Sequence, residues 1–300
     1  MALSERVASV KSNTCCICCC STSILNYFRK KNEHGQYSIV KCRSCGSAYV
    51  WPRPDISVMA SYYQDASYSN LTLEQAVQSD LQYYLNSGHD SLRIVERCTQ
   101  LTTGRRFLDA GAGLGMFSKT ALRAGFDVSA CEPNPNARNV FRQLNGFEPE
   151  SCLFDKEYAD RHRGAFDVVL LSQVLEHITD PEEIVEHIRT VLREGGIAVV
   201  AVPHFGSALS RVQGKKDMFI SPPEHLNFFS KRGLIALFER YQFRLERIET
   251  VSKVNSGKIR DAVHFPILRD AVWIGLYSVL KVFEVFGMGM VINAYFRKRN

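Results

Sequence analysis

The stretch F-L-D-A-G-A-G-L-G-M-F-S-K-T-A-L-R-A-G-F-D-V-S-A-C-E, residues 107–132, decides the fold of this chain. A short apolar run ends in Asp109. Three glycines follow at alternate positions: Gly111, Gly113 and Gly115. Apolar residues then recur at helical spacing, and a second apolar run ends in Glu132. This order of strand, glycine turn, helix, strand and acid predicts the first half of a nucleotide-binding α/β fold.

The glycine turn also indicates the kind of ligand. Glycine lets the backbone turn sharply and approach a ligand closely, and a carboxylate at position 132 can accept hydrogen bonds from ribose hydroxyls. A dinucleotide fingerprint requires glycine at position 116, which is Met116. The spacing therefore favours S-adenosylmethionine over NAD, with Asp109 placed to orient the loop or the amino-acid tail of the cofactor. The alternative is a plain βαβ turn without a ligand.

Three further segments follow the glycine loop: F-D-V-V-L-L-S-Q-V-L-E-H-I-T-D-P (166–181), V-L-R-E-G-G-I-A-V-V-A-V-P (191–203) and E-H-L-N-F-F-S (224–230). Together with the loop, and in this order, they resemble the class I S-adenosylmethionine-dependent methyltransferases. The resemblance runs from about Leu101 to the C-terminus. It implies an α/β fold with a Rossmann-like sheet of seven strands.

Several residues after the glycine loop are candidates for the cofactor site. Ser172 and Gln173 end an uninterrupted apolar strand, where open α/β sheets bind ligands. The resemblance implies that Asp155 meets the adenine amino group. It also implies that Glu176 and His177 help to shape the site, and in some quinone-pathway relatives this pair can touch a metal. A structural Glu and a capped His are the alternative for the pair.

Seven of the ten cysteines lie within residues 11–45. Two C-x-x-C pairs flank a short strand at 37–40 and provide four thiolates for tetrahedral structural zinc, as in a zinc ribbon. The four preferred ligands are Cys15, Cys18, Cys42 and Cys45. Cys16 and Cys19 have the same spacing as the first pair, and the preference for the earlier frame rests on a resemblance of C-x-I-C to the C-P-I-C knuckle of such ribbons. The alternative is a reduced cysteine-rich tail without metal.

The chain divides into three parts on these patterns. Residues 1–54 form the zinc ribbon, residues 55–100 a helical lead-in or lid, and residues 101–300 the methyltransferase domain. In the lead-in, Tyr62 and Tyr63 resemble a tyrosine pair that the family often carries near its active site, although packing alone is the simpler interpretation.

His225 is the candidate general base, because a histidine titrates near neutral pH and this one lies just before a helix over the ligand edge of the sheet. Sugar C- and O-methyltransferases with this ribbon carry a similar Glu-His at this place, which implies that Glu224 orients His225. His204 stands where relatives commonly have Asn and is a second candidate base. Anchoring of a loop and a simple polar substitution are the structural alternatives for His225 and His204.

Composition and charge bear on the cellular location of the protein. The 300 residues carry a net charge of +6, and the N-terminus lacks the apolar core of a signal peptide. Ten cysteines without an export signal indicate metal binding in a cytoplasmic protein rather than disulfides. Residues 271–286 are strongly apolar, but Lys281 and Glu284 interrupt them. We expect an amphipathic helix rather than a transmembrane segment, with contact to a membrane surface as the alternative.

These features predict a methyltransferase that acts on a small molecule, a sugar or nucleotide-sugar type acceptor, by O- or C-methylation. The alternative is an RNA methyltransferase that grips nucleic acid with its ribbon, and a third interpretation is a non-enzymatic cofactor-binding scaffold. The fourth strand lacks both the N/D-P-P-Y/F motif of amino-group methyltransferases and the Pro-Cys of cytosine C5 enzymes. Exocyclic-amine and covalent nucleic-acid chemistry are disfavoured accordingly.

Overall fold

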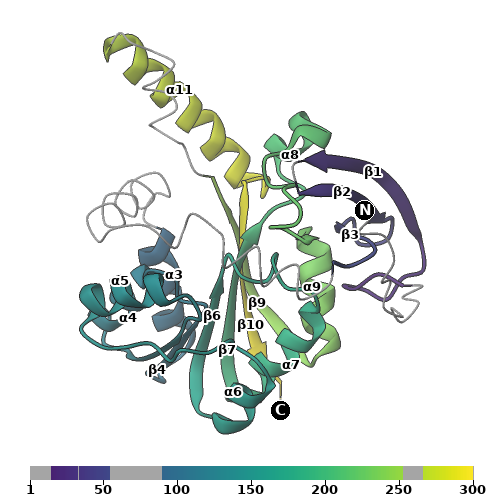
Figure 1. Ribbon diagram of the computed structural model, residues 1–300. Coiled ribbons are helices and arrows are strands. Elements are labelled where there is room, and N and C mark those ends of the chain that lie inside the picture. Colours follow the sequence, from purple (N-terminus) through teal and green to yellow (C-terminus); the bar gives the residue numbers. More distant parts are fainter. Residues whose placement is uncertain (1–14, 33, 55–89, 253–265, 300) are drawn as a thin grey trace, which may run out of the picture.

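The computed structural model of the chain describes residues 15–32, 34–54, 90–252 and 266–299 (Figure 1). These residues form two sheets. The larger sheet contains β4 (Arg106–Ala110), β5 (Asp127–Cys131), β6 (Phe166–Ser172), β7 (Leu192–Pro203), β9 (Phe243–Val251) and β10 (Val291–Lys298). The smaller sheet contains β1 (Ile24–Asn32), β2 (Gly35–Cys42), β3 (Ala48–Val50) and β8 (Asn227–Phe228).

The larger sheet has the strand order β5-β4-β6-β7-β10-β9. Strands β5, β4, β6 and β7 are parallel, whereas β10 is antiparallel to both of its neighbours. The α/β class is confirmed, but the described residues give six strands rather than seven. Beside β5, the described residues make only a single parallel bridge, between Cys131 and Glu150. Pro149 precedes this bridge and has no N–H with which to extend a ladder.

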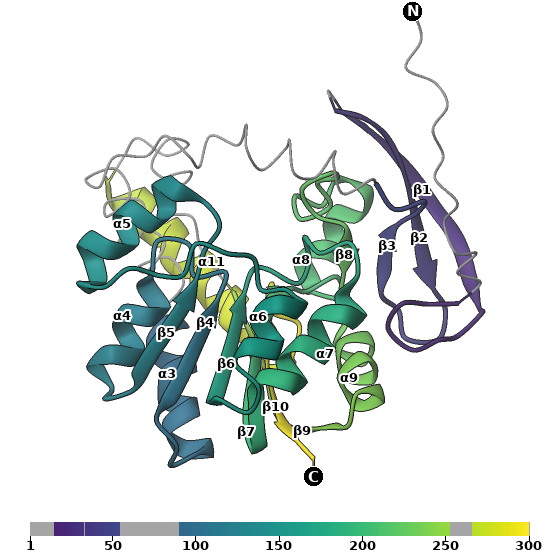
Figure 2. The ribbon, with the colours of Figure 1, turned by 60° about the horizontal axis from the view of Figure 1, so that its bottom comes forward.

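Helices cover both faces of the larger sheet (Figure 2). They are α3 (Asp90–Leu101), α4 (Met116–Arg123), α5 (Pro135–Asn145), α6 (Lys156–Arg161), α7 (Pro181–Val191) and α9 (Lys231–Arg240). Alternate residues of β6 point to opposite faces. Val168 and Leu170 pack with the side chains of α3 and α4, and Val169 and Leu171 pack with those of α6, α7 and α9. The sheet is therefore buried on both sides, as its continuous apolar strands require.

Local signals set several helix starts. Asp180 accepts hydrogen bonds from the N–H groups of Glu182 and Glu183, and Pro181 occupies the first turn of α7. Ser230 caps α9 in the same way through the N–H of Gly233. Both starts follow from residue types within a few positions of the helix end.

The smaller sheet joins the cysteine-rich segment to the larger domain. Strands β1, β2 and β3 form an antiparallel ribbon, and β3 pairs with β8, which lies in the segment 224–230. Ala48 pairs with Phe228 and Tyr49 with Asn227, and the N–H of Val50 donates to the Leu226 carbonyl at 2.9 Å. The ribbon is thus completed by a strand from the domain on which it rests.

The start of α9 packs against the same ribbon. The Ser230 hydroxyl donates to the Cys45 carbonyl at 2.6 Å, and the Ser230 N–H donates to the Ser47 hydroxyl at 3.0 Å. Further along α9, the Arg240 guanidinium donates to the Ile17 carbonyl at 3.2 Å. These contacts hold α9 and the cysteine knuckles together.

Three shorter or outlying elements complete the fold. Helix α8 (Ala208–Gln213) and the 3-10 turn η2 (Gly214–Lys216) follow β7, and α11 (Pro266–Val285) connects β9 to β10. Within the described ranges, no helix combines the length and the apolarity needed to span a bilayer. Of the lead-in expected over 55–100, only the part within α3 is described, and Tyr62 and Tyr63 lie outside the described residues.

Substitution of Gly233 tests how closely α9 packs against the ribbon. A Cβ on Gly233 falls 1.9 Å from the Ser47 hydroxyl and 3.3 Å from the Cys45 sulfur. We expect Gly233→Ala to lower the free energy of unfolding by about 1–3 kcal/mol, because an overpacked contact must shift. The matched control is Gly275→Ala in α11, where an added Cβ meets open space and favours the helix by up to about 1 kcal/mol. Urea unfolding compares the two variants, and equal stability of Gly233→Ala and the parent contradicts the close packing.

Candidate functional site

The glycine loop between β4 and α4 has a backbone that only glycine adopts readily. Gly111, Gly113 and Gly115 have φ angles of 75°, 53° and 86°. Space is restricted as well, because a Cβ on Gly111 falls 2.8 Å from Val174 and one on Gly115 falls 2.3 Å from the Asn145 amide. The loop is therefore a tight cradle at the carboxyl end of β4.

Glu132 joins this cradle to the end of β5. Its carboxylate accepts the N–H of Gly113 and the N–H of Asn134, both at 2.8 Å. Burial raises the pKa of this carboxyl, while the two N–H donors favour the ionised form. A carboxylate has about four acceptor positions, so two remain for the ribose hydroxyls of S-adenosylmethionine. The residues present fit the cofactor.

Asp109 helps to orient the glycine loop through a contact with α4. Its side chain is 2% exposed and accepts a hydrogen bond from the Ser118 hydroxyl of α4 at 2.7 Å. Burial raises the pKa of Asp109 to about 6. Of the two roles expected for this residue, the contact with α4 supports orientation of the loop.

The other predicted cofactor residues lie on neighbouring parts of the same edge. Gln173 follows β6 with a φ of 57°, a strained conformation that clusters at functional sites, and its N–H and side-chain amide both donate to the Ala201 carbonyl. Ser172 ends β6 itself. Asp155 is exposed and caps α6 through the N–H of Tyr158 at 2.9 Å. Because the parallel strands end together, Ser172, Gln173 and Glu132 share the carboxyl edge of the sheet.

Two motifs that are distant in sequence meet beyond the end of β6. The N–H groups of Leu226 and Asn227 donate to the Glu176 carbonyl at 2.8 and 3.0 Å. The rings of His177 and His225 contact each other edge to face, with centroids 4.7 Å apart. One potential ligand atom from each of Glu176, His177 and His225 lies within 4.8 Å of the others. This histidine pair therefore belongs to the same edge as the cofactor residues.

The two histidines differ in environment. Nδ1 of His225 donates to the Phe219 carbonyl at 2.8 Å, because a carbonyl only accepts, and this leaves Nε2 as the acceptor atom of the neutral ring. His225 is half-buried. Nδ1 of His177 donates to the Glu224 carbonyl at 2.7 Å, and burial, followed by the charge of His225, lowers the pKa of His177 to about 4. His177 is therefore neutral at pH 7.

The orientation of His225 differs from the expected arrangement. Glu224 was expected to orient the ring, but Nδ1 is held by the Phe219 carbonyl. The Glu224 carboxylate instead accepts from the Ser221 hydroxyl at 3.3 Å. Glu224 contributes to the site through its main chain, which fixes His177. The backbone of the 219–225 loop thus performs the orienting task that the sequence assigned to a side chain.

His204 has an anchoring position. Its side chain is 4% exposed, its Nδ1 donates to the Gly289 carbonyl at 2.9 Å, and burial lowers its pKa to about 4. A Cβ on Gly206 falls 2.8 Å from Nε2. This packing fastens the end of β7 to the start of β10 and favours the structural interpretation of His204 over that of a base.

Arg53 and Asn227 are parts of the site that the sequence analysis did not identify. The Asn227 amide donates to the carbonyls of Leu175 and Ile178 at 3.0 and 2.7 Å and accepts from the Arg53 guanidinium. Arg53 also donates to the Leu226 carbonyl at 3.0 Å, and burial lowers its pKa to about 10. The ribbon exit is thereby bonded to both histidine-bearing loops. No motif or spacing in the sequence marks this contact.

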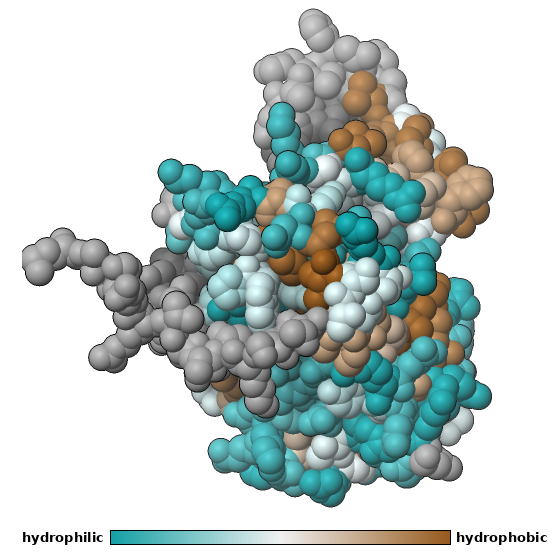
Figure 3. Space-filling view, turned by 90° about the vertical axis from the view of Figure 1, so that its right-hand side faces the viewer, coloured by the Kyte–Doolittle hydropathy of each residue, from teal (hydrophilic) through white to brown (hydrophobic). Residues whose placement is uncertain are grey.

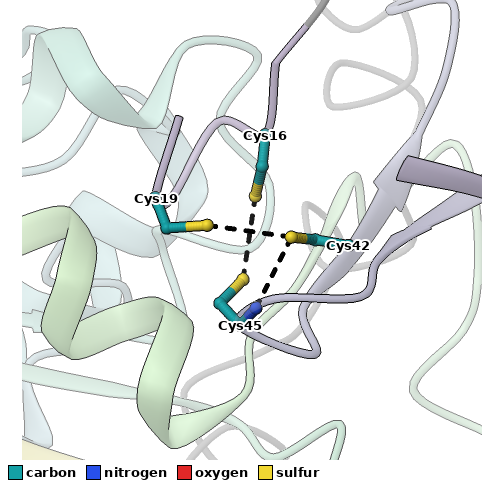
Figure 4. Close-up of side chains that lie close together, drawn as sticks. All are labelled: Cys16, Cys19, Cys42 and Cys45. Atoms are coloured by element: carbon teal, nitrogen blue, oxygen red, sulfur yellow. Dashed lines mark hydrogen bonds between the residues drawn. The ribbon is translucent and has the colours of Figure 1, made fainter. Parts of the chain in front are cut away.

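The cysteine cluster is shown in Figure 4. Its four thiols are those of Cys16, Cys19, Cys42 and Cys45, and their sulfur atoms lie within 4.8 Å of one another. The pairs Cys16–Cys45 and Cys19–Cys42 are each separated by 3.7 Å. Sulfur atoms bound tetrahedrally to zinc at about 2.3 Å are about 3.8 Å apart. The arrangement therefore fits one structural zinc ion.

The first pair of this cluster is the alternative frame rather than the preferred one. The structure gathers Cys16 and Cys19, not Cys15 and Cys18, around the second knuckle. Cys16 lies at the turn, because its N–H donates to the Ser21 carbonyl and its carbonyl accepts from Cys20. Both frames have identical spacing, so only the register of this turn distinguishes them.

The fold and the cradle together define a cofactor-binding α/β domain of the methyltransferase type, and comparisons with known proteins agree. The family model of a methyltransferase domain matches residues 78–248. Because the match covers more than half of the chain, the chain belongs to this family. The predicted class I S-adenosylmethionine-dependent methyltransferase is confirmed at this level.

Curated relatives match a shorter part. The ubiquinone biosynthesis O-methyltransferase of Cupriavidus pinatubonensis is 29% identical over 151 residues, which cover 44% of this chain and 60% of the relative. The protein of the same name from Aromatoleum aromaticum is 34% identical over 151 residues, which cover 44% of this chain and 64% of the relative. The chain thus spans less than two thirds of these relatives. A methyltransferase–activator complex from Haloferax volcanii has a TM-score of 0.50 at 13% identity, covers 81% of this chain and 98% of that chain, and shows the fold alone.

The cysteine frame is testable by metal content. We expect Cys16→Ser and Cys19→Ser each to lower the bound zinc well below one ion per chain, because three thiolates hold zinc less tightly than four. Cys15→Ser is the matched control and should retain full zinc. Atomic absorption on the purified proteins measures the content. Loss of zinc in Cys15→Ser with retention in Cys16→Ser would restore the earlier frame.

Proposed function

We propose that this protein transfers the methyl group of S-adenosylmethionine to a hydroxyl oxygen of a small-molecule acceptor, with His225 as the general base. The observation that carries the proposal is the hydrogen bonding of the His225 ring. Its Nδ1 is held by the Phe219 carbonyl at 2.8 Å, so the lone pair of Nε2 is available, and the ring lies beyond the carboxyl end of β6. A base at this edge suits an acceptor whose proton must leave.

The cofactor residues have separate roles in this proposal. Glu132 accepts hydrogen bonds from the ribose hydroxyls, the glycine cradle lets the backbone approach the cofactor, and Asp155 meets the adenine amino group. Ser172 and Gln173 line the side nearest the acceptor. The bound cofactor supplies an electrophilic methyl group on a sulfonium, so the main task of the chain is to align donor and acceptor.

His177 packs against the proposed base, His225. Its ring contacts that of His225 edge to face, and its pKa of about 4 keeps it neutral at pH 7. A neutral neighbour does not repel the positive charge that His225 gains when it takes the proton. The buried carbonyl network around Glu176 and Asn227 fixes the distance between the two loops.

The class of acceptor is a narrower part of the proposal. The named relatives support O-methylation of a small molecule, whereas the sugar or nucleotide-sugar acceptor rests on the combination of the ribbon with Glu224 and His225. A sugar and another small molecule that undergoes O-methylation both bear a hydroxyl group, so His225 can act as the base for either acceptor. The cytoplasmic location inferred from the sequence remains a prediction.

Two basic residues of the ribbon are engaged within the protein rather than free for the phosphate groups of an RNA acceptor. Lys41 lies 5.1 Å from the ring centroid of Tyr27 and 5.4 Å from that of Phe205, and Lys30 donates to the Ile220 carbonyl. These cations hold the ribbon against the 205–223 loop. Phosphate contacts from the same side chains would require these bonds to break.

We expect His225→Ala to lower kcat by about 10²–10⁴, the usual contribution of a general base, with unchanged affinity for the cofactor. The matched control is His34→Ala, an exposed ribbon histidine, which should retain kcat. Transfer of labelled methyl from S-adenosylmethionine into a lysate lacking the enzyme gives the rate, and separation by size and nuclease treatment gives the acceptor class. Full activity of His225→Ala contradicts the base, and label in large nuclease-sensitive material contradicts the small acceptor.

Glu132→Ala separates the cofactor assignment from that of the base. Loss of the ribose acceptor and of the bond to Gly113 should remove measurable binding of S-adenosylmethionine in calorimetry. Unchanged affinity would disprove the ribose role of Glu132 while leaving the test of His225 intact.

A further inference from the structure

Helix α11 stands outside the body of the protein. Figure 1 shows that it projects away from the two sheets, with its C-terminal end at β9 and β10. That end is fixed, because the Glu284 carboxylate accepts from the Ser252 N–H and the Glu284 carbonyl accepts from the Thr250 hydroxyl at 3.4 Å. The helix is therefore attached at one end and extends from it.

The exposed side chains of α11 and of the turn that follows it are apolar to an unusual degree. Side chains that are 41–85% exposed are those of Val272, Ile274, Leu276, Val279, Val282, Val285 and Phe286. Figure 3 shows apolar residues gathered on the projecting part, above a mostly hydrophilic body. Exposed apolar surface of this extent marks an interaction site.

Most of these apolar residues form one stripe. At about 100° per residue, Val272, Leu276, Val279 and Val282 lie within about 120° of one another. Lys281 and Glu284 lie on the other side of the helix. An apolar stripe opposite charged residues is the pattern of a helix that lies in the plane of a membrane interface.

Charged residues limit how deep such a helix can go. Residues 271–280, A-V-W-I-G-L-Y-S-V-L, contain no charged side chain, but Arg269 and Asp270 precede them and Lys281 follows. Lengthwise insertion would bury Arg269 and Asp270 in the hydrocarbon core, which is costly. The helix therefore fits an orientation along the membrane interface, in agreement with the lack of a spanning helix among the described residues.

Cationic residues surround the fixed end of the helix. Helix α8 lies beside it, because the Ala208 N–H donates to the Met288 carbonyl at 3.0 Å, and the Lys231 ammonium donates to the Gly287 carbonyl at 2.8 Å. The exposed cations on α8 and η2 are Arg211, Lys215 and Lys216. Exposed Val212 and Met218 lie among them, at 85% and 54%. Apolar side chains interspersed with Lys and Arg match an anionic lipid surface.

We propose that α11 lies in the interface of an anionic lipid bilayer with its apolar stripe toward the acyl chains, and that α8 and η2 rest on the headgroups. The helix leaves the body at the carboxyl edge of the parallel strands, since Val291 pairs with Pro203 and His204 bonds to Gly289. Insertion therefore brings the edge that carries the glycine cradle and His225 to the membrane surface. This inference does not depend on the proposed general base.

Vesicle sedimentation of the full chain tests the insertion. The probes are vesicles of phosphatidylcholine alone and of phosphatidylcholine with phosphatidylglycerol at about 7:3, and we expect binding to the anionic vesicles that weakens as salt is added. Leu276→Glu with Val279→Glu should lower the partition coefficient by about a hundredfold or more, since each buried apolar side chain contributes about tenfold or more. The matched control is Leu92→Glu with Leu153→Glu, two exposed apolar residues away from α11, which should bind as the parent does.

Fluorescence provides a second readout that requires no change in α11. The chain has two tryptophans, so Trp51→Phe leaves Trp273 as the only reporter. Anionic vesicles should shift its emission to shorter wavelength as the ring enters the apolar region. An unchanged spectrum, or equal binding by both double variants, overturns the proposal. A parent dimer that ignores vesicles and dissociates in Leu276→Glu with Val279→Glu assigns α11 to a second copy instead.

Discussion

The pairing of β3 with β8 is the interaction on which the candidate site depends. It makes the cysteine ribbon and the segment 224–230 one sheet, and the bond between Asn227 and Arg53 strengthens the junction. His225 precedes β8 by two residues, so its position follows from the ribbon. The glycine cradle, by contrast, is built on β4 and β5 without any ribbon residue. The proposed cofactor site and the proposed base therefore have separate structural supports that meet at one edge.

The sequence predicted the parts of the fold that are determined by residues close together along the chain. Gly111 and Gly115 need positive φ angles and have no room for a Cβ, which the alternate glycines already indicated. Asp180 with Pro181 starts α7, and Ser230 starts α9, through bonds to N–H groups two or three residues on. Glu132 follows its strand directly. Each of these signals is complete within a few residues, so a single sequence is enough to read it.

The parts that the sequence did not predict depend on contacts between distant segments. Asn227 lies 174 positions from its partner Arg53, and no local pattern records that pairing. The frame of the first cysteine pair is set by a turn around Cys16, because both frames have the same spacing. The Phe219 carbonyl orients His225, and a main-chain atom leaves no trace in residue types. The missing seventh strand reflects a segment that makes only one bridge, a difference too small for apolar patterning to resolve.

We infer that the thiolate cluster holds the His225 loop in place and has no part in binding the cofactor. The most direct test removes zinc with a chelator and measures kcat and the Kd for S-adenosylmethionine on the same sample, before and after zinc is restored. We expect kcat to fall about tenfold or more without zinc and to recover when zinc is added, while the Kd stays unchanged. Full turnover without zinc would contradict this inference, and so would a Kd that weakens in step with kcat.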